Sequence, residues 1–168
     1  IDRISKKIKS YQKTTILGPG DDAAIINSKK NILISTDMLV EGIHFDMSFT
    51  PLKHLGYKSV IVNLSDIYAM NATPSQITVS LGISSKYTLE AIDELYEGIL
   101  LACDKYKIDI IGGDITSCLS GLTISITAIG QALPKNIVTR NGAKENDLLI
   151  VSGDLGAVSY THLRAHET

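Results

Sequence analysis

The stretch that decides the fold is Ile32-Leu33-Ile34-Ser35-Thr36-Asp37-Met38-Leu39-Val40-Glu41-Gly42-Ile43-His44-Phe45. Its first apolar residues predict a β-strand, which leads directly into two hydroxyl side chains and a carboxylate. A second acid, a glycine and a histidine follow within seven residues. Polar groups at the end of a strand are where folded scaffolds often carry binding and catalytic side chains. We therefore take this stretch as the first candidate for a functional site.

Acids at the edges of apolar segments recur along the chain. Asp21 and Asp22 follow a Gly-Pro-Gly turn, Asp66 closes the motif Asn-Leu-Ser-Asp, and Asp114 follows two glycines. None of these acids, nor Asp37, has a Lys or Arg within three positions. Carboxylates that converge without basic partners need cations, and oxygen ligands of this kind suit Mg²⁺. Each Asp taken singly is more often a turn or capping residue, so the spacing alone leaves both interpretations open.

The hydrophobic pattern predicts strands that alternate irregularly with helices, which favours an α+β fold. We expect helices over residues 2–11, 51–70 and 88–107, with Thr50 and Thr88 as N-caps. The expected strands are residues 23–26 and 32–36 as a hairpin, then 76–83, 108–111, 122–128 and 148–151. Residues 136–147 are expected to form a polar loop.

The composition bounds the class of protein. The 168 residues are 44% hydrophobic and 20% charged, with a net charge of −2 and no Trp. This predicts a globular domain and offers neither the basic excess nor the aromatic platforms that nucleic acids require. No apolar run approaches the roughly 20 residues that span a membrane. Cys103 and Cys118 lack metal-site spacing and predict a reduced, cytoplasmic protein.

Several common catalytic motifs are absent. The sequence contains neither of the two frequent glycine-rich nucleotide-binding motifs and no Gly-x-Ser-x-Gly. Without other information, His44 reads as a structural histidine, Tyr96 as a core residue of a helix, and Arg140 as a solvated loop residue. The functional alternative for Arg140 is a clamp on phosphate.

The order of four motifs resembles the thiamine-monophosphate kinase family. They are Gly20-Asp21-Asp22-Ala23-Ala24, Ser35 to Phe45, Asn63-Leu64-Ser65-Asp66 and Gly112-Gly113-Asp114, and the resemblance continues through Arg140-Asn141-Gly142-Ala143-Lys144. The resemblance implies the aminoimidazole ribonucleotide synthetase-like fold, with a mixed or antiparallel sheet and helices packed on one face. It also implies ATP-dependent phosphorylation of thiamine monophosphate to thiamine diphosphate, and homodimers that pair through their N-terminal domains.

The resemblance further implies roles for individual residues, with positioning and metal assistance in place of a catalytic base. His44 corresponds to a contact with the thiamine phosphate, and several Mg²⁺ ions are expected. The implied metal ligands are Asp21, Ser35, Thr36, Asp37, Asp66 and Asp114, and the implied nucleotide contacts are Tyr96, Gly113, Asp114 and Arg140.

The resemblance also predicts how the chain is divided. Residues 1–156 are expected to be the N-terminal domain for ATP, Mg²⁺ and dimerisation, with the C-terminal domain of the family missing. The last ten residues resemble translated adaptor sequence, so residues 157–168 are expected to be a non-native tail. Two alternatives remain: another ATP-using enzyme of the same superfamily, or a non-catalytic dimerisation or metal-binding module.

Overall fold

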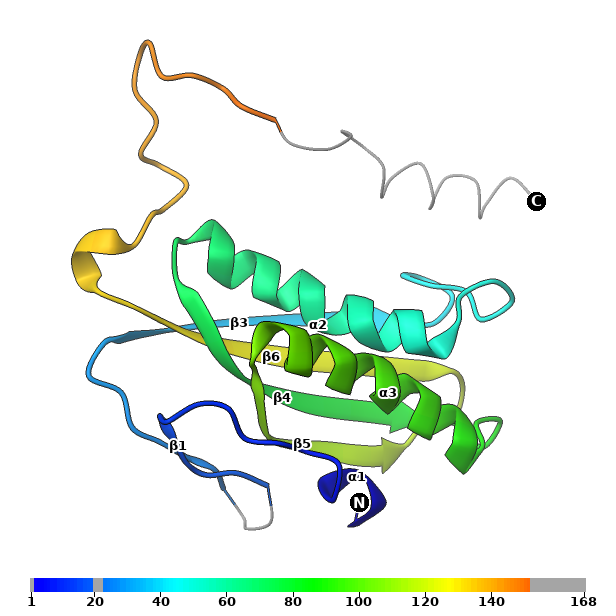
Figure 1. Ribbon diagram of the computed structural model, residues 1–168. Helices are drawn as coiled ribbons and strands as arrows, with labels where there is room; N and C mark the ends of the chain where they lie inside the picture. Colours follow the sequence, from blue (N-terminus) through cyan, green and yellow to red (C-terminus); the bar gives the residue numbers. More distant parts are fainter. Residues whose placement is uncertain (1, 20–22, 152–168) are drawn as a thin grey trace. The chain divides into compact units, whose positions relative to one another are not determined.

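Four strands form one mixed sheet in the computed structural model, which describes residues 2–19 and 23–151 (Figure 1). The strands lie in the order β3-β6-β4-β5. Strand β6 pairs antiparallel with β3 and β4, and β4 pairs parallel with β5. The bounds are β3 (Asn31–Val40), β4 (Thr73–Ile83), β5 (Asp109–Ser117) and β6 (Leu122–Ala132). The predicted mixed sheet of an α+β fold is confirmed.

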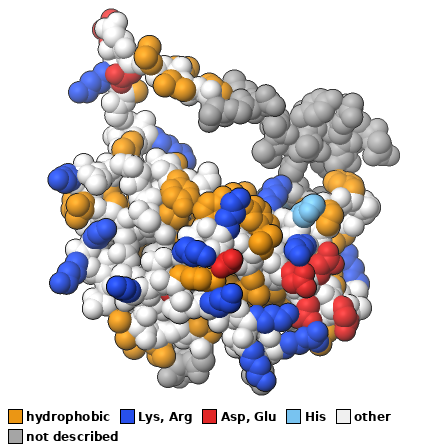
Figure 2. All heavy atoms as spheres, in the orientation of Figure 1, with side chains coloured by type: hydrophobic (Ala, Val, Ile, Leu, Met, Phe, Trp, Pro, Cys, Tyr) orange, Lys and Arg blue, Asp and Glu red, His pale blue; other side chains and the backbone are white. Residues whose placement is uncertain are grey.

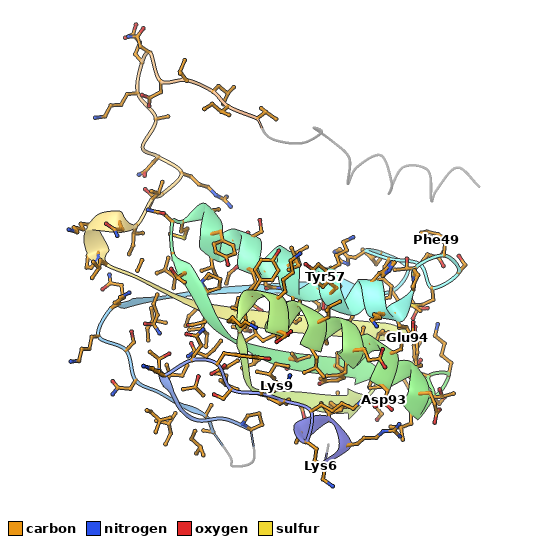
Figure 3. The ribbon with its side chains drawn as sticks, viewed as in Figure 1. Lys6, Lys9, Phe49, Tyr57, Asp93 and Glu94 are labelled. Carbon is orange, nitrogen blue, oxygen red and sulfur yellow. The ribbon has the colours of Figure 1, made fainter. Side chains whose placement is uncertain are left out.

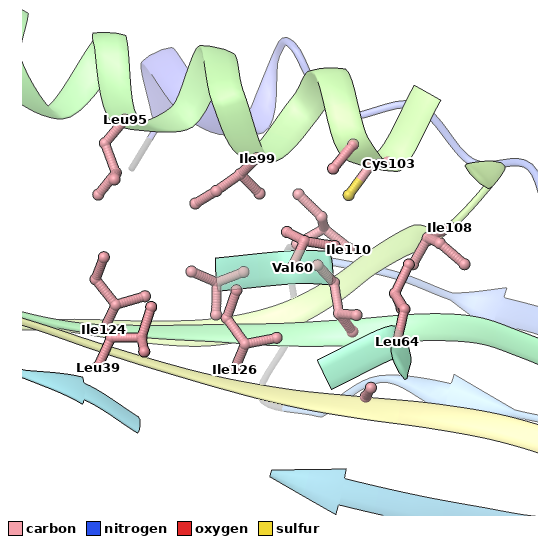
Figure 4. Packing of buried hydrophobic residues seen from close by; sticks show 14 of the residues in the cluster. Leu39, Val60, Leu64, Leu95, Ile99, Cys103, Ile108, Ile110, Ile124 and Ile126 are labelled. Carbon is pink, nitrogen blue, oxygen red and sulfur yellow. The ribbon is translucent and has the colours of Figure 1, made fainter. Parts of the chain in front are cut away.

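Two helices, α2 (Leu52–Ala69) and α3 (Leu89–Tyr106), cover one face of this sheet (Figure 1). Every second residue of β6 from Leu122 to Ala132 is buried, so one face of that strand contributes to the core and the other remains half-buried. Figure 4 shows side chains of α2 and α3 packed against the sheet. Each fully buried Leu or Ile in this layer contributes about 1.5–3 kcal/mol.

The two helices approach each other closely at two glycines. A Cβ atom on Gly56 would overlap the backbone of Leu95, and one on Gly98 would overlap the backbone of Lys53. The helices therefore pack backbone against backbone at this crossing. Outside the crossing, Tyr68 and Leu101 stay half exposed, and Figure 2 shows hydrophobic side chains gathered over this helical layer.

The N-terminal segment lies against the edge of the sheet formed by β5. Helix α1 (Asp2–Ser5) makes an ion pair from Arg3 to Asp93 of α3, which lies beside α1 in Figure 3. Strand β1 (Thr15–Leu17) pairs antiparallel with β2 (Ile25–Ile26) in a separate small sheet. Between α1 and β1, the chain forms hydrogen bonds with two buried polar side chains of the sheet, Gln76 on β4 and Asp109 on β5.

The predicted helix over residues 2–11 is wrong beyond Ser5. The backbone N–H groups of Tyr11 and Gln12 donate to the Asp109 carboxylate, so they are not available to helical carbonyls. The predicted hairpin of residues 23–26 with 32–36 is also wrong. Strand β2 has only two residues and pairs with β1, whereas all ten residues of β3 pair with β6.

Other predicted elements match more closely. The helices at 51–70 and 88–107 and the strands at 76–83 and 122–128 are confirmed, and the strand expected at 108–111 extends to Ser117. Thr88 caps α3 through its side chain, which accepts from the N–H of Ala91. Thr50 does not cap α2, because the extended Pro51 occupies the cap position without a side-chain hydrogen bond.

The chain divides after Val138 into a second unit. In its described part, a turn joins Lys144 and Asp147, and the Lys144 N–H donates to the Asp147 carboxylate at 2.7 Å. The strand predicted for residues 148–151 does not form. Its leucines are exposed, and it has no ladder partner among the described residues. The expected tail, residues 157–168, lies outside the described residues. No described helix is long and apolar enough to cross a membrane.

Candidate metal and phosphate site

Ser35 and Asp66 meet where the edge strand β3 lies beside α2, and Asp37 follows on the same strand. Successive side chains of a strand point to opposite faces of the sheet. Ser35 and Asp37 therefore lie on the same face of β3 as the buried Leu33 and Leu39. The Ser35 hydroxyl donates to Asp66 Oδ2 at 2.7 Å. The hydroxyl of Ser35 on β3 is therefore hydrogen-bonded to an acid on α2 that lies 31 residues further along the chain, and Asp37 lies two residues after Ser35 on the same face of β3.

Asn63 fixes this arrangement from the α2 side. Its buried side-chain oxygen accepts the backbone N–H of Asp37 at 2.9 Å, while its amide nitrogen donates to the Ser59 carbonyl. This contact ties the middle of β3 to the helix turn that precedes Asp66. The sequence pointed to Asn63 only as part of the Asn-Leu-Ser-Asp motif, without giving it a role.

Thr36 points to the opposite face of β3. Its hydroxyl donates to the carbonyl of Ile126 at 3.1 Å and accepts from the Thr127 hydroxyl at 3.1 Å. The side chain is thus bonded to β6, on the face without helices.

Asp114 is separated from these acids within one chain. It lies on β5, paired with Ser80 of β4. Across the sheet, Ser80 pairs with Ser125 of β6, and Ser125 pairs with Met38 of β3. Three strand spacings, about 14 Å, therefore lie between β3 and Asp114. Asp114 also shares the face of Met38, opposite to that of Asp37. A single cation cannot contact Asp37 and Asp114 of the same chain across this distance.

Gly113 and Asp114 do not form a turn, which was the plain alternative for this motif. Both lie within β5, and Gly113 has a φ of 151°, in a region that side chains rarely adopt. A Cβ atom there would overlap the backbone of Val79 on β4. Only glycine fits this close approach of the two strands.

His44 lies in the turn that follows β3, with its ring half-buried. The backbone N–H of Val40 donates to His44 Nδ1 at 3.0 Å. In the neutral ring the proton must then be on Nε2, which leaves that nitrogen as a hydrogen-bond donor. A donor of this kind suits a phosphate oxygen.

The remaining predicted site residues are Tyr96, Arg140 and Asp21. Tyr96 is buried in α3, and burial raises its pKa to about 12, which favours the core interpretation. Arg140 is exposed and lies in the second unit, which begins at Thr139. Asp21 lies outside the described residues. The roles of all three as ligands or contacts stay predictions.

The chemistry available at the β3 edge follows from its charges. Within the described ranges, neither Asp37 nor Asp66 forms an ion pair with Lys or Arg. No group of three or more His, Cys, Asp or Glu that could hold a metal occurs among those residues either. Two carboxylates and a hydroxyl match the donor set of Mg²⁺, which takes one or two carboxylates and completes its shell with water and phosphate.

Comparison with known proteins gives matches over most of the chain. Residues 20–132 match the family model "AIR synthase related protein, N-terminal domain". The thiamine-monophosphate kinase of Bacillus subtilis (strain 168) is 36% identical over 149 residues, 88% of this chain and 46% of that protein. That of Buchnera aphidicola subsp. Schizaphis graminum is 44% identical over 160 residues, with 91% and 48% covered. The chain thus spans about half the length of the curated relatives it matches.

Solved structures give the same result. The crystal structure of thiamine-monophosphate kinase from Stenotrophomonas maltophilia K279a has a TM-score of 0.74 at 32% identity, covering 86% of this chain and 45% of that one. AaThiL complexed with AMPPCP and TMP has a TM-score of 0.74 at 30% identity, covering 94% and 49%. The hydrogenase maturation protein HypE in complex with ATP, at 20% identity and a TM-score of 0.67, shares the fold.

Proposed function

The chain belongs to the AIR synthase related family through its N-terminal domain, and on that premise we propose that it is part of a kinase that phosphorylates thiamine monophosphate with ATP. The relatives with this name and the complex with AMPPCP and TMP support the proposal. The product is thiamine diphosphate, formed by transfer of the γ-phosphoryl group to the acceptor phosphate. We place the protein in the cytoplasm, which fits its two free cysteines.

The observation that carries the proposal is the hydrogen-bonded group of Ser35, Asp37, Asn63 and Asp66. Asp37 in the middle of the edge strand β3 and Asp66 on α2 have no basic partner among the described residues. Asp37 lies seven residues before a histidine that can donate to phosphate. Bound Mg²⁺ would neutralise the negative charge of two phosphate groups brought together. The proposed metal ligands are Asp21, Ser35, Thr36, Asp37, Asp66 and Asp114, and the proposed nucleotide contacts are Tyr96, Gly113, Asp114 and Arg140.

In this proposal, the chain positions the reactants and removes no proton through a dedicated base. Asp37 and Asp66 would hold the cations. Asn63 accepts from the backbone N–H of Asp37 and so fixes that position of β3, and the Ser35 hydroxyl donates to the Asp66 carboxylate. The His44 Nε2–H donates to the acceptor phosphate and orients it. Phosphoryl transfer depends mainly on such positioning and on charge stabilisation.

We also propose that two copies pair through the sheet face without helices. Ile32, Ile34 and Met38 on this face of β3 are each about half exposed or more, at 48%, 68% and 56%. Covering them would remove apolar surface from water. Separately, a site shared by Asp37 and Asp114 would require the Asp114 of a second copy, because one cation cannot reach both acids of the same chain.

The experiment for the activity is an assay for thiamine diphosphate with ATP and Mg²⁺. It compares this chain alone with the same chain fused to the second half of the Buchnera relative. The fusion should turn over, and the chain alone should not, because the acceptor then lacks half of its cleft. A fusion that folds, binds ATP and forms no thiamine diphosphate would contradict the proposed substrate.

A mixing experiment tests the shared site. Asp37→Asn and Asp114→Asn fusions should each be inactive, whereas dimers mixed from both should regain about a quarter of the sites, because one site per mixed dimer is intact. If the two acids act within one chain, no mixture regains activity.

A further inference from the structure

Glu41 is the one acid of the Ser35–Phe45 motif to which the proposed chemistry gives no role. Its side chain is only 16% exposed and faces two donors. The Tyr87 hydroxyl donates to Oε2 at 2.7 Å, and the Lys86 ammonium forms an ion pair with Oε1. The backbone N–H of Glu41 donates to the Leu122 carbonyl at 3.0 Å. One residue thus ties the end of β3 to the loop before α3 and to the start of β6.

The charges at this contact agree with its geometry. Burial acts to raise the pKa of Glu41, but the hydrogen bonds from Lys86 and Tyr87 outweigh it, so the pKa is lowered. Burial and the neighbouring carboxylate raise the pKa of Tyr87. Glu41 is therefore held as a carboxylate, and Lys86 offsets its charge, so it does not repel a phosphate bound nearby.

The turn after Glu41 carries His44. Gly42, at a φ of 79°, donates to the Phe45 carbonyl at 2.8 Å, and His44 donates its backbone N–H to the Val40 carbonyl at 2.9 Å. These bonds are all local to residues 40–45. Within the described part of the chain, the buried Phe45 and the contacts of Glu41 connect this turn to the rest of the domain. The orientation of the His44 ring depends on that connection, because its Nδ1 accepts from Val40, the residue next to Glu41.

We infer that Glu41, anchored by Tyr87 and Lys86, is a positioning residue that fixes the His44 ring with Nε2–H presented to a phosphate. The identity of the phosphate as that of thiamine monophosphate rests on the proposed function. Glu41 itself acts through the turn and does not touch the substrate. A loose turn would let the imidazole rotate and exchange its proton between Nδ1 and Nε2. His44 would then no longer present a fixed Nε2–H donor to the phosphate.

The test uses the 168-residue chain labelled with ¹⁵N-histidine, observed at about pH 8, where an ordinary imidazole is neutral. The His44 signals are assigned from their loss in His44→Gln. We expect an unprotonated Nδ1 and a protonated Nε2 in the wild type. In Glu41→Gln and Tyr87→Phe, the His44 signals should shift toward a mixture of both tautomers. Hydrogen exchange at the Val40 amide should become about tenfold faster, as expected when a hydrogen bond to a charged group is lost.

Glu97→Gln is the matched control, because it removes an exposed ion pair with Lys53 elsewhere on the helices and should leave His44 and Val40 unchanged. Wild-type His44 signals and Val40 exchange in both Glu41→Gln and Tyr87→Phe would overturn the positioning role, even if both variants were less stable. This readout needs no ligand. Titration of the wild-type chain with thiamine monophosphate is separate: absence of binding would count against the proposed function and leave the positioning role intact.

Discussion

The attachment of the N-terminal segment to β5 depends on one buried carboxylate. Asp109 is 1% exposed and accepts from the Ser10 hydroxyl and from the backbone N–H groups of Tyr11 and Gln12. Asp109→Ala removes this acceptor and leaves the two N–H groups without a partner. A hydrogen bond to a charged group contributes about 1.5–3 kcal/mol. The Ser10 hydroxyl is exposed and can turn to water, so we count the two N–H groups alone and expect a loss of about 3 kcal/mol.

Urea unfolding of the wild type and Asp109→Ala measures this loss as a shift of the midpoint. Two results distinguish how the segment responds. An unchanged m-value means that the segment stays in place with unpaired donors, and a lower m-value means that it detaches and the native state buries less surface. Asp104→Ala is the control, because Asp104 contacts Tyr11 from an exposed position on α3 and its loss should leave the midpoint unchanged. An Asp109→Ala midpoint equal to that of the wild type, with the same m-value, would refute the reasoning.

Three further changes test other parts of the structure. Gly98→Ala should destabilise the fold by about 1–3 kcal/mol in thermal unfolding, because its Cβ overlaps the backbone of α2, whereas Gly112→Ala has free space and should not. Burial raises the pKa of Cys103 to about 12, so its thiol stays protonated in the folded protein. Iodoacetamide should therefore label Cys118, which is less buried, before Cys103. The free energy of unfolding should fall as the pH rises above about 9, where the Cys103 thiol of the unfolded chain ionises. Equal labelling rates in mass spectra would contradict that burial. Arg140→Ala in the fused kinase should raise the KM for ATP more than that for thiamine monophosphate, and equal changes would indicate a solvated loop.

The parts of the fold that could be predicted are those encoded locally. The apolar spacing of α2 and α3 and the cap at Thr88 depend on residues three or four apart, and both are confirmed. Strand pairing was predicted wrongly, because the residues that pair with β3 lie some 90 positions further along the chain. Nothing in the Asn27–Asn31 turn indicates whether a hairpin or a long ladder forms.

The candidate site also combines features that the sequence could predict with features that depend on long-range contacts. The resemblance to a known family predicted a site shared by Ser35 and Asp66, and these side chains, 31 residues apart, are hydrogen-bonded to each other, whereas their role as metal ligands stays a prediction. The sequence could not reveal that Asp114 lies on the opposite edge and face of the sheet, since that depends on strand order. The contacts of Glu41 with Lys86 and Tyr87 also join residues 45 and 46 positions apart, which no local pattern signals.

The central claim is that the acids at the edge of β3 bind divalent cations together with a nucleotide. Calorimetric titration of the chain with Mn²⁺ in the presence of AMPPCP tests this claim most directly, in the wild type, in Asp37→Asn and in Asp46→Asn. Asp46 is an exposed loop acid bonded to Ser48, so its variant controls for the loss of one charge. The account predicts that Asp37→Asn weakens Mn²⁺ binding about tenfold or more, as one of few carboxylates is lost, and that Asp46→Asn leaves it unchanged. Equal Mn²⁺ affinity in the wild type and Asp37→Asn would contradict the account.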